Sequence, residues 1–372
     1  MAERFKPRDE ADVADIIAAC TTALEPVGGG SKRSIGRPVR AAVLDLSALS
    51  GIVRYEPDEL VLSARAATPL EEVQWALGAA GQRLAFDPPN LEQLLAVNAV
   101  PTIGGVLAAN LSGSRRLTAG AARDHFLGFR AVTGRGERFK GGGRVVKNVT
   151  GYDMPKLLAG SWGTLAVLTE VTIRVHPAPE HERTLLVPTT LVGAAVATMS
   201  AALGSACEVS AAAFAPRRGV ALRIEGFMPS VRARSTALLE LIDGADHIWL
   251  EAEDSRAFWE EMGAAVPLAA EAIVWRLSVP PREAVRVLDE LAAQDYLLDW
   301  GGGLIWIAGA HLDAARVRGV LHGGHATLIK APPEMRAAVS AFQPLPAPLA
   351  ALTARLKAAL DPAGKLNPGR MD

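Results

Sequence analysis

Three segments rich in glycine and other small residues, each beside an apolar stretch, constrain this chain more than any other feature. They are Val27–Gly36, Pro101–Gly113 and Lys147–Val175, and a fourth segment, Asp361–Met371, closes the chain. Small residues let the backbone come close to a large anionic ligand, and successive N–H groups without side chains attract anions. The order and spacing of these segments predict one cradle built from separated parts of the sequence.

The first segment contains the run Gly28, Gly29, Gly30, Ser31 and Lys32. Consecutive glycine N–H groups can surround a phosphate, while the serine adds a hydroxyl donor and the lysine a cation. The spacing does not fit a triphosphate-binding loop, which requires a further glycine before its Gly-Lys pair. Taken alone, a triple glycine is equally typical of a flexible turn.

The second segment contains Thr102, Ile103, Gly104 and Gly105, followed by Asn110. Its small residues let a backbone turn lie against a bound ligand, and the threonine and asparagine side chains can fix that turn by hydrogen bonds. No dinucleotide motif of the Gly-x-Gly-x-x-Gly type follows a strand and opens a helix, so a nicotinamide site is not supported.

Composition narrows the class of protein. The chain has 372 residues, 49% of them hydrophobic, and a formal net charge of −1, which argues against a nucleic-acid-binding protein. Its only cysteines, Cys20 and Cys207, cannot form a disulfide framework or supply the four thiolates of a typical iron–sulfur cluster. His322 and His325 flank two glycines, but no third ligand is nearby, so we predict no metal site.

No targeting signal or membrane span is expected. The N-terminal residues lack a basic region followed by an apolar core, and the uncharged stretch Thr184–Cys207 is interrupted by Pro188. A strand at Leu185–Val187 followed by a buried alanine-rich helix explains that stretch better than a transmembrane helix. We therefore expect a cytoplasmic protein, and leave open whether it docks on the inner face of a membrane.

Hydrophobic periodicity predicts the local structure of the first half. A helix is expected over Arg8–Ala19, and Thr68-Pro-Leu-Glu71 resembles a capping box with proline at the first helical position. The alternation from Val167 to Val175 is the cleanest strand pattern in the chain. His176-Pro-Ala-Pro-Glu180 then breaks the pattern, and we place a domain boundary there.

The second half alternates strand-like and helix-like runs, which predicts a smaller α+β domain. Leu349, Leu352, Leu356 and Leu360 form the apolar stripe of a last helix, and we expect this stripe to pack in the core. The predicted domains are 1–180, 181–340 and a C-terminal helix and tail, 341–372, that returns to the first domain.

The segments above resemble the FAD-binding domain of the vanillyl-alcohol oxidase and p-cresol methylhydroxylase superfamily, and within it the FAD-binding subunits of bacterial glycolate oxidases. The resemblance covers nearly the whole chain. It implies an α+β fold with a two-lobed FAD-binding domain and a smaller α+β cap. It also implies FAD as cofactor, and no histidine lies in the first loop or in the second segment, where many relatives attach FAD covalently. We therefore expect non-covalent FAD. His125, just after Asp124, is the histidine that leaves covalent attachment open.

The resemblance also assigns roles to residues. It implies that the first loop holds the FAD pyrophosphate, that the second segment lies at the flavin, and that Asp124 occupies the acidic position of the family. It places Gly163 and Val167 in a turn and strand against the cofactor, and Asn367 near the flavin pyrimidine. Many relatives have glutamate where this chain has Trp162.

Three functions are compatible with these observations. The first is an FAD-binding subunit of a complex that oxidises glycolate to glyoxylate, working with a second flavin subunit and an iron–sulfur subunit, as the resemblance implies. The second is a self-sufficient oxidoreductase for another 2-hydroxy acid or sugar alcohol, and the third is a scaffold that retains the fold. The spacing selects no catalytic base among His311, His325 and Lys330.

Overall fold

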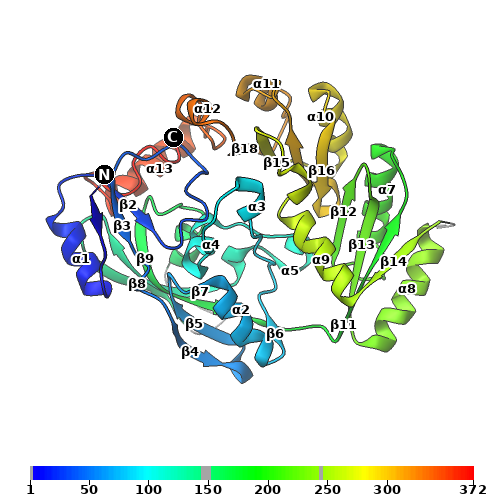
Figure 1. Ribbon diagram of the computed structural model, residues 1–372, viewed down its shortest axis with the longest axis horizontal. Helices are drawn as coiled ribbons and strands as arrows, with labels where there is room; N and C mark the ends of the chain where they lie inside the picture. The colour runs from blue at the N-terminus through cyan, green and yellow to red at the C-terminus, as the bar shows by residue number, and fades with distance from the viewer. Residues whose placement is uncertain (1–2, 144–151, 243–245) are drawn as a thin grey trace.

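The computed structural model describes residues 3–143, 152–242 and 246–372. Its described strands form sheets of three, two, eight and five strands. Figure 1 shows two lobes, with the three-stranded and five-stranded sheets on the left and the eight-stranded sheet on the right. The helices α3 (Glu92–Leu95), α4 (Ile103–Ala109) and α5 (Arg116–Ala119) lie between the two lobes.

The first lobe combines a parallel sheet with an antiparallel one. The order of the three-stranded sheet is β1-β3-β2, and that of the five-stranded sheet is β4-β5-β9-β7-β8. The strands are β1 (Arg4–Phe5), β2 (Leu24–Val27), β3 (Ala42–Asp45), β4 (Ile52–Glu56), β5 (Val61–Arg65), β7 (Phe126–Thr133), β8 (Arg138–Gly142) and β9 (Ala166–Arg174), with the pair β6 (Gln82–Arg83) and β10 (His176–Pro177). The remaining elements are α1 (Glu10–Ala19), α2 (Leu70–Ala79), α6 (Met154–Leu158), η1 (Pro57–Glu59) and η2 (Ala122–Asp124).

The periodicity predictions for this lobe hold, with one correction at a helix start. Helix α1 begins after Asp9, whose side chain accepts hydrogen bonds from two backbone N–H groups of the first turn. The capping box predicted at Thr68 is wrong, because α2 begins at Leu70 with no side-chain cap. The Thr68 hydroxyl instead donates to the Arg65 carbonyl at 2.7 Å and accepts from the Gly51 N–H at 2.9 Å, fixing the preceding turn.

The second lobe is an eight-stranded sheet in the order β14-β11-β13-β12-β16-β17-β15-β18. Its strands are β11 (His181–Val187), β12 (Ala211–Ala215), β13 (Gly219–Gly226), β14 (Ile248–Glu251), β15 (Val274–Ser278), β16 (Asp295–Asp299), β17 (Leu304–Ala308) and β18 (His325–Lys330). The helices are α7 (Val192–Leu203), α8 (Met228–Ile242), α9 (Ala252–Gly263), α10 (Ala284–Leu291), α11 (Ala314–Gly319) and α12 (Pro333–Ala338), with short turns η3 (Val266–Leu268), η4 (Pro281–Glu283) and η5 (Trp300–Gly302). Helix α13 (Ala347–Leu360) lies beside the first lobe. The α+β class is confirmed.

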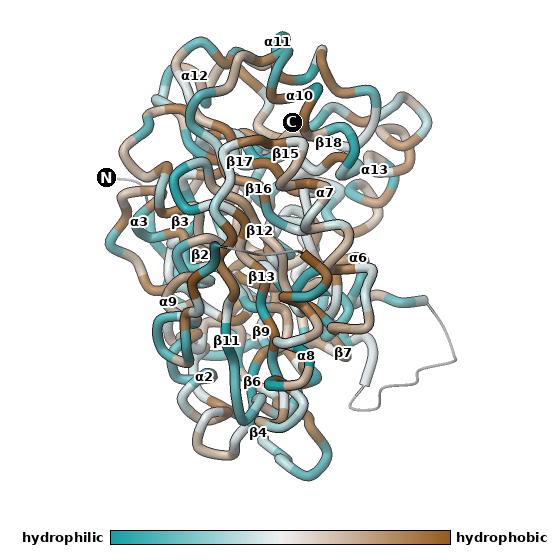
Figure 2. The backbone as a smooth tube through the Cα atoms, turned by 90° about the vertical axis from the view of Figure 1, so that its right-hand side faces the viewer, coloured by the Kyte–Doolittle hydropathy of each residue, from teal (hydrophilic) through white to brown (hydrophobic). Residues whose placement is uncertain are grey.

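The two faces of the eight-stranded sheet have different partners, because successive side chains of a strand point to opposite faces. Trp275 and Ile305 belong to a buried cluster that includes residues of α7 and α10. Trp306 belongs to another cluster that includes Leu94 and Trp162 of the first lobe. Figure 2 shows the hydrophobic colouring of β12, β13 and β16 at the centre of the molecule. One face therefore packs on its own helices, and the other faces the first lobe.

The C-terminal tail returns to the first lobe, beside β2. Leu366 forms an isolated parallel bridge with Leu24, and the Asn367 N–H donates to the Leu24 carbonyl at 2.9 Å. The core packing expected of the α13 stripe is wrong for Leu349 and Leu352, whereas Leu360 is partly buried against the core of the first lobe. None of its residues is buried, and Leu349 and Leu352 are 51% and 49% exposed. We propose that the domains divide at residues 180 and 340, as predicted from the sequence.

Candidate functional site

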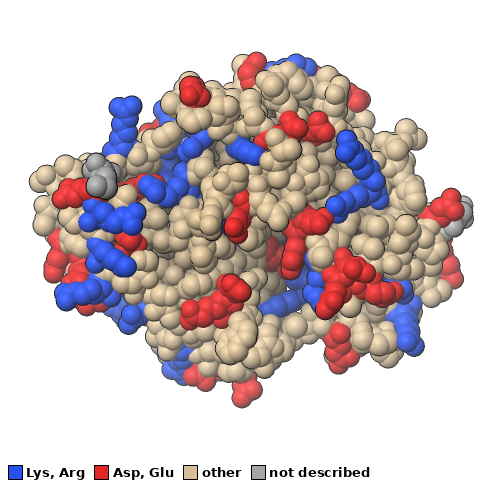
Figure 3. All heavy atoms as spheres, in the orientation of Figure 1, with Lys and Arg blue, Asp and Glu red and all other residues tan. Residues whose placement is uncertain are grey.

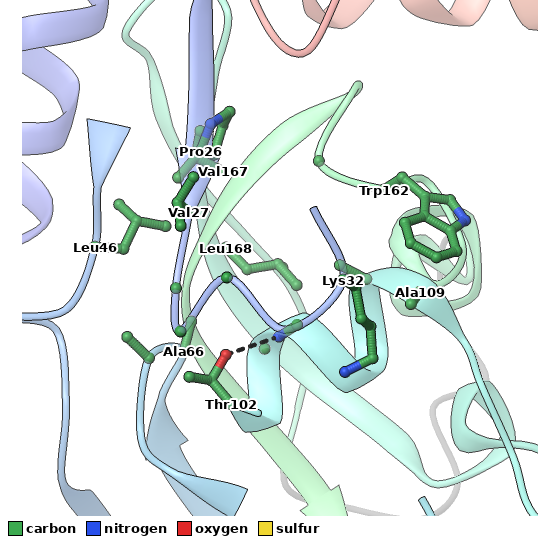
Figure 4. A pocket seen from close by; sticks show the side chains of 18 of the residues that line it. Pro26, Val27, Lys32, Leu46, Ala66, Thr102, Ala109, Trp162, Val167 and Leu168 are labelled. Carbon is green, nitrogen blue, oxygen red and sulfur yellow. Dashed lines mark hydrogen bonds between the residues drawn. The ribbon is translucent and has the colours of Figure 1, made fainter. Parts of the chain in front are cut away.

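A cavity of about 820 Å³, open to solvent, lies where the first loop, α4, β9 and the C-terminal tail meet. Figure 4 shows the loop carrying Lys32 beside α4, with Trp162 and Ala109 near the lysine, and Leu46 across from them. The Arg370 guanidinium donates to the Lys32 carbonyl at 2.8 Å. Segments more than three hundred residues apart in sequence therefore form one wall of the cavity. The separated segments do assemble into one cradle.

Two glycines of the cradle leave no room for a side chain. A Cβ at Gly29 would lie 1.6 Å from the Val100 carbonyl oxygen, and a Cβ at Gly104 would lie 2.6 Å from the Ala66 carbonyl oxygen. Real Cβ atoms do not approach backbone that closely. The loop thus presses directly on the second segment, and the Thr102 hydroxyl accepts a hydrogen bond from the Gly105 N–H at 3.3 Å.

Lys32 supplies a buried cation at this cavity. It is 9% exposed, and its Nζ donates to the Ser31 hydroxyl at 3.3 Å. Within the part of the chain that the structure describes, no carboxylate forms an ion pair with it, and burial lowers the pKa of the ammonium to about 8. A cation in this position is stabilised by an anionic ligand.

Asn367 presents an unused acceptor in the same wall. Its Nδ2 donates to the Trp162 carbonyl at 2.8 Å, whereas its buried Oδ1 has no hydrogen-bond partner. A buried polar atom without a partner is costly and marks a place where a ligand group can bind. Trp162 itself has φ of 54°, a left-handed conformation, next to Gly163 with φ of 68°.

All the site residues predicted from the sequence line this cavity except Ile103, Asn110 and Asp124. Ile103 is fully buried in the core of the first lobe. The Asn110 side chain accepts from the Arg123 N–H at 3.0 Å and lines a second cavity. Asp124 accepts from the Ala121 N–H at 2.8 Å and so caps its own turn. The predicted stretch 147–151 lies outside the described residues.

The histidine and lysine candidates are dispersed. His125 is fully buried against Phe86 and His176, with its Nε2 2.8 Å from the Ala119 carbonyl, and it does not line the cavity. Lys330 donates to the Ala269 carbonyl at 2.8 Å, and the His311 ring lies 3.3 Å from the Leu291 carbonyl. Over the described ranges, no group of three or more metal-ligating side chains is present.

A second cavity of about 1020 Å³, measured with its opening, adjoins the first, and Ala109 and Trp162 line both. It lies between the two lobes, and Arg116, Arg276 and His325 are among its residues. Of these, only His325 was a candidate from the sequence. Arg276 was missed, although a charged residue inside the apolar strand run 274–279 is the kind of signal that marks a functional position.

On the face shown in Figure 3, acidic and basic side chains are interspersed, and no extended basic stripe crosses it. Among the described helices, none combines the length and the apolar composition needed to cross a bilayer.

A glycine-lined cradle that carries a buried cation, in an α+β fold of two lobes, defines a protein that binds a large anionic cofactor. The family model described as FAD binding domain matches residues 2–142, which include the first loop and the second segment. The protein is thus an FAD-binding flavoprotein.

The particular family follows from a comparison over nearly the whole chain. The chain is 35% identical over 347 residues to the glycolate oxidase subunit GlcE of Escherichia coli (strain K12), which covers 92% of this chain and 91% of that protein. The chain belongs to the GlcE family of FAD-linked oxidoreductase subunits.

Two further proteins resemble it less closely. The glycolate oxidase subunit GlcD of Bacillus subtilis (strain 168) is 28% identical over 199 residues, which cover 52% of this chain and 41% of that subunit. A solved structure of alkyldihydroxyacetonephosphate synthase superposes with a TM-score of 0.68 at 16% identity, covering 98% of this chain and 76% of that one. The second similarity concerns the fold alone.

Proposed function

We propose that this chain is the FAD-binding subunit of a complex that oxidises glycolate to glyoxylate and passes the electrons to an iron–sulfur partner. The observation that carries the proposal is the identity of 35% to GlcE over 92% of the chain. The similarity of half the chain to GlcD supports a second flavin subunit in the same complex. With two cysteines in the sequence, the chain lacks the four thiolates of a typical iron–sulfur cluster, so the cluster belongs to a partner.

The residues of the cradle fit FAD. We propose that the backbone of Gly28–Gly30, Ser31 and Lys32 holds the pyrophosphate, because successive N–H groups and a buried ammonium complement two negative phosphates. Asn367, with its unpaired buried acceptor, is proposed to bind a hydrogen-bond donor of the cofactor. Bound FAD supplies the two-electron acceptor for oxidation of an alcohol carbon. We propose that it is held non-covalently, because His125 does not line the cradle.

The second cavity favours substrate binding on this same chain over a scaffold role. It adjoins the cradle through Ala109 and Trp162 and carries basic side chains, while none of the described residues that line it is an aspartate or a glutamate. A 2-hydroxy acid is an anion at neutral pH, so its carboxylate is attracted to this site.

The test is an anaerobic absorption spectrum of the purified chain, recorded before and after adding glycolate. A flavin band that bleaches shows that this subunit oxidises the substrate by itself. A band that stays unchanged, and bleaches only after partner subunits are added, supports the electron-transfer role within a complex. The absence of a flavin band after reconstitution with FAD contradicts the proposal and leaves a scaffold.

A further inference from the structure

The second cavity is lined by two arginines, one from each lobe. Arg116 lies on α5 of the first lobe, and Arg276 lies on β15 of the eight-stranded sheet. Within residues 3–143, 152–242 and 246–372, neither guanidinium takes part in a hydrogen bond or an ion pair, and both line the cavity. Buried or half-buried arginines are normally paired with carboxylates, since desolvating an unpaired charge is costly. Their position predicts an anion between the lobes.

Arg276 is held in place by aromatic rings rather than by an acid. Its Cζ lies 4.8 Å from the centroid of the Trp300 ring and 5.7 Å from that of Trp306. Such stacking orients the planar guanidinium while leaving its N–H groups free for a ligand. The carboxylate that acts on its charge is Asp299, which is 1% exposed and already accepts from the Ser114 hydroxyl and the Trp300 N–H, each at 2.7 Å.

The strand register surrounds Arg276 with small polar groups. Arg276 lies opposite Thr327 of β18, and Ser278 lies opposite His325. Opposed residues point to the same face of a sheet, as do residues two apart on one strand, and all of these residues line the cavity. This face therefore offers a guanidinium, two hydroxyls and an imidazole at one place. Such a set suits a small anion that also carries a hydroxyl.

The charges of this site act on one another. Burial lowers the pKa of Arg276 to about 10, with the Asp299 carboxylate opposing the shift and the positive charge of Arg116 adding to it. Burial also lowers the pKa of His325, and the charge of Arg276 adds to that shift. Two guanidinium groups that repel each other in the free protein gain most from an anion placed between them. Arg123 lines the same cavity, but its guanidinium is paired with a carboxylate, because Asp124 lies 3.9 Å from its Nε.

We infer that Arg276, with Arg116 facing it from the other lobe, binds the carboxylate of a small 2-hydroxy acid, and that Ser278, Thr327 and His325 receive the remaining polar groups. The inference rests on the proposed function, since it names residues that hold its substrate. It also gives the second lobe a specific role, because that lobe contributes Arg276 while the first lobe contributes Arg116. Selectivity for a carboxylate over a neutral diol then depends on these two residues.

The experiment measures binding of oxalate by isothermal titration calorimetry to the FAD-reconstituted chain, with ethylene glycol as the neutral comparison. Oxalate is used because it has carboxylates but no hydroxyl-bearing carbon to oxidise. In Arg276→Gln we expect affinity for oxalate to fall by about 10- to 100-fold, as for the loss of one charge-assisted pair. Arg116→Gln is expected to lose about tenfold. Arg282→Gln is the control, since that side chain is 86% exposed on the same lobe and its affinity should equal that of the unchanged chain.

The outcomes separate this inference from the proposed function. Affinity for oxalate in Arg276→Gln within twofold of the unchanged chain overturns the inference, and so does an unchanged chain that binds oxalate no better than ethylene glycol. If Arg276→Gln instead loses FAD and keeps its affinity for oxalate, the arginine serves the cofactor and the inference is wrong. If oxalate binding depends on Arg276 but glycolate never reduces the flavin, even with partner subunits, the proposed function fails while the anion site stands. Arg276→Lys, which keeps the charge and loses the planar fork, should recover part of the affinity.

Discussion

At the scale of single residues, Lys32 links burial to cofactor affinity. Burial holds the pKa of its ammonium at about 8, so half of the free protein has lost this charge near pH 8 and most of it has lost the charge at higher pH. Bound FAD stabilises the charged form and raises that pKa, so affinity is highest below pH 8 and falls above it. We expect the dissociation constant of FAD to rise between pH 8 and 9.5, by at most about tenfold per pH unit.

The measurement is a fluorescence titration of the apoprotein with FAD at several pH values. In Lys32→Met the affinity should be lower at pH 7 and the dependence on pH above 8 should disappear. Lys140→Met, which removes an exposed lysine of β8, should behave like the unchanged chain. An unaltered pH profile in Lys32→Met would rule out this lysine as the titrating group.

His125 and His176 form a pair of titratable side chains away from the cradle. Their rings contact edge to face at 5.2 Å. Burial lowers the pKa of His176 to about 4, with the charges of His125, Arg174 and Arg83 adding to it. Because the folded pKa lies below the unfolded value of 6.5, the neutral ring stabilises the fold above pH 6.5, and this contribution is lost as the pH falls towards 4. The thermal unfolding midpoint should therefore drop between pH 7 and 5, and drop less in His176→Gln. His322→Gln, at an exposed histidine, should not reduce the drop.

At the scale of elements, the first loop depends on glycine for its contact with the second segment. In Gly29→Ala the new Cβ would lie 1.6 Å from the Val100 carbonyl oxygen, so the loop must move away from its cradle position. We expect binding of FAD to weaken by at least about tenfold, which is about 1.4 kcal/mol. Gly78→Ala is the matched control, because a Cβ at this position of α2 meets nothing within 4 Å. It should leave binding of FAD unchanged and stabilise the helix by up to about 1 kcal/mol.

Elements differ in how much their sequence reveals. The alternation in β9 is enough to predict a strand. The cradle could be predicted from the order and spacing of several small-residue segments, since such residues let the backbone approach a ligand closely. Strand β12, Ala211–Ala215, could not, since it is buried on both faces and rich in alanine, and so shows neither alternation nor β-branched residues. The stripe of α13 correctly groups its leucines on one helix, but periodicity does not say whether a neighbour covers that face. The site of Arg276 depends on the register of β15 with β18 and on the packing of the two lobes. The residue pattern within one segment of the sequence does not reveal either of these.

At the scale of the whole molecule, a buried network of charges joins the lobes. Arg115 of the first lobe donates to Glu225 of the second lobe at 2.6 Å and to Asp87 at 2.5 Å. Arg83 also forms an ion pair with Glu225 at 2.7 Å, and Arg223 of the second lobe forms one with Asp87 at 3.2 Å. Burial alone would raise the pKa of Glu225, but the arginines hold it well below its usual range. With Glu182, 3.9 Å from Arg115, the positive and negative charges balance.

Removing Arg115 should therefore destabilise the closed pair of lobes. Arg115→Met leaves an excess of buried carboxylates, and we expect it to lower the free energy of unfolding by about 3–5 kcal/mol. The measurement is urea unfolding at a fixed excess of FAD, so that ligand binding does not alter the comparison. Arg282→Met, at a largely exposed side chain, should change the free energy by less than about 0.5 kcal/mol. In the double variant Arg115→Met, Glu225→Met the charges balance again, so part of the loss should be recovered. A double variant as unstable as the sum of its single variants would show that the network does not act through charge balance.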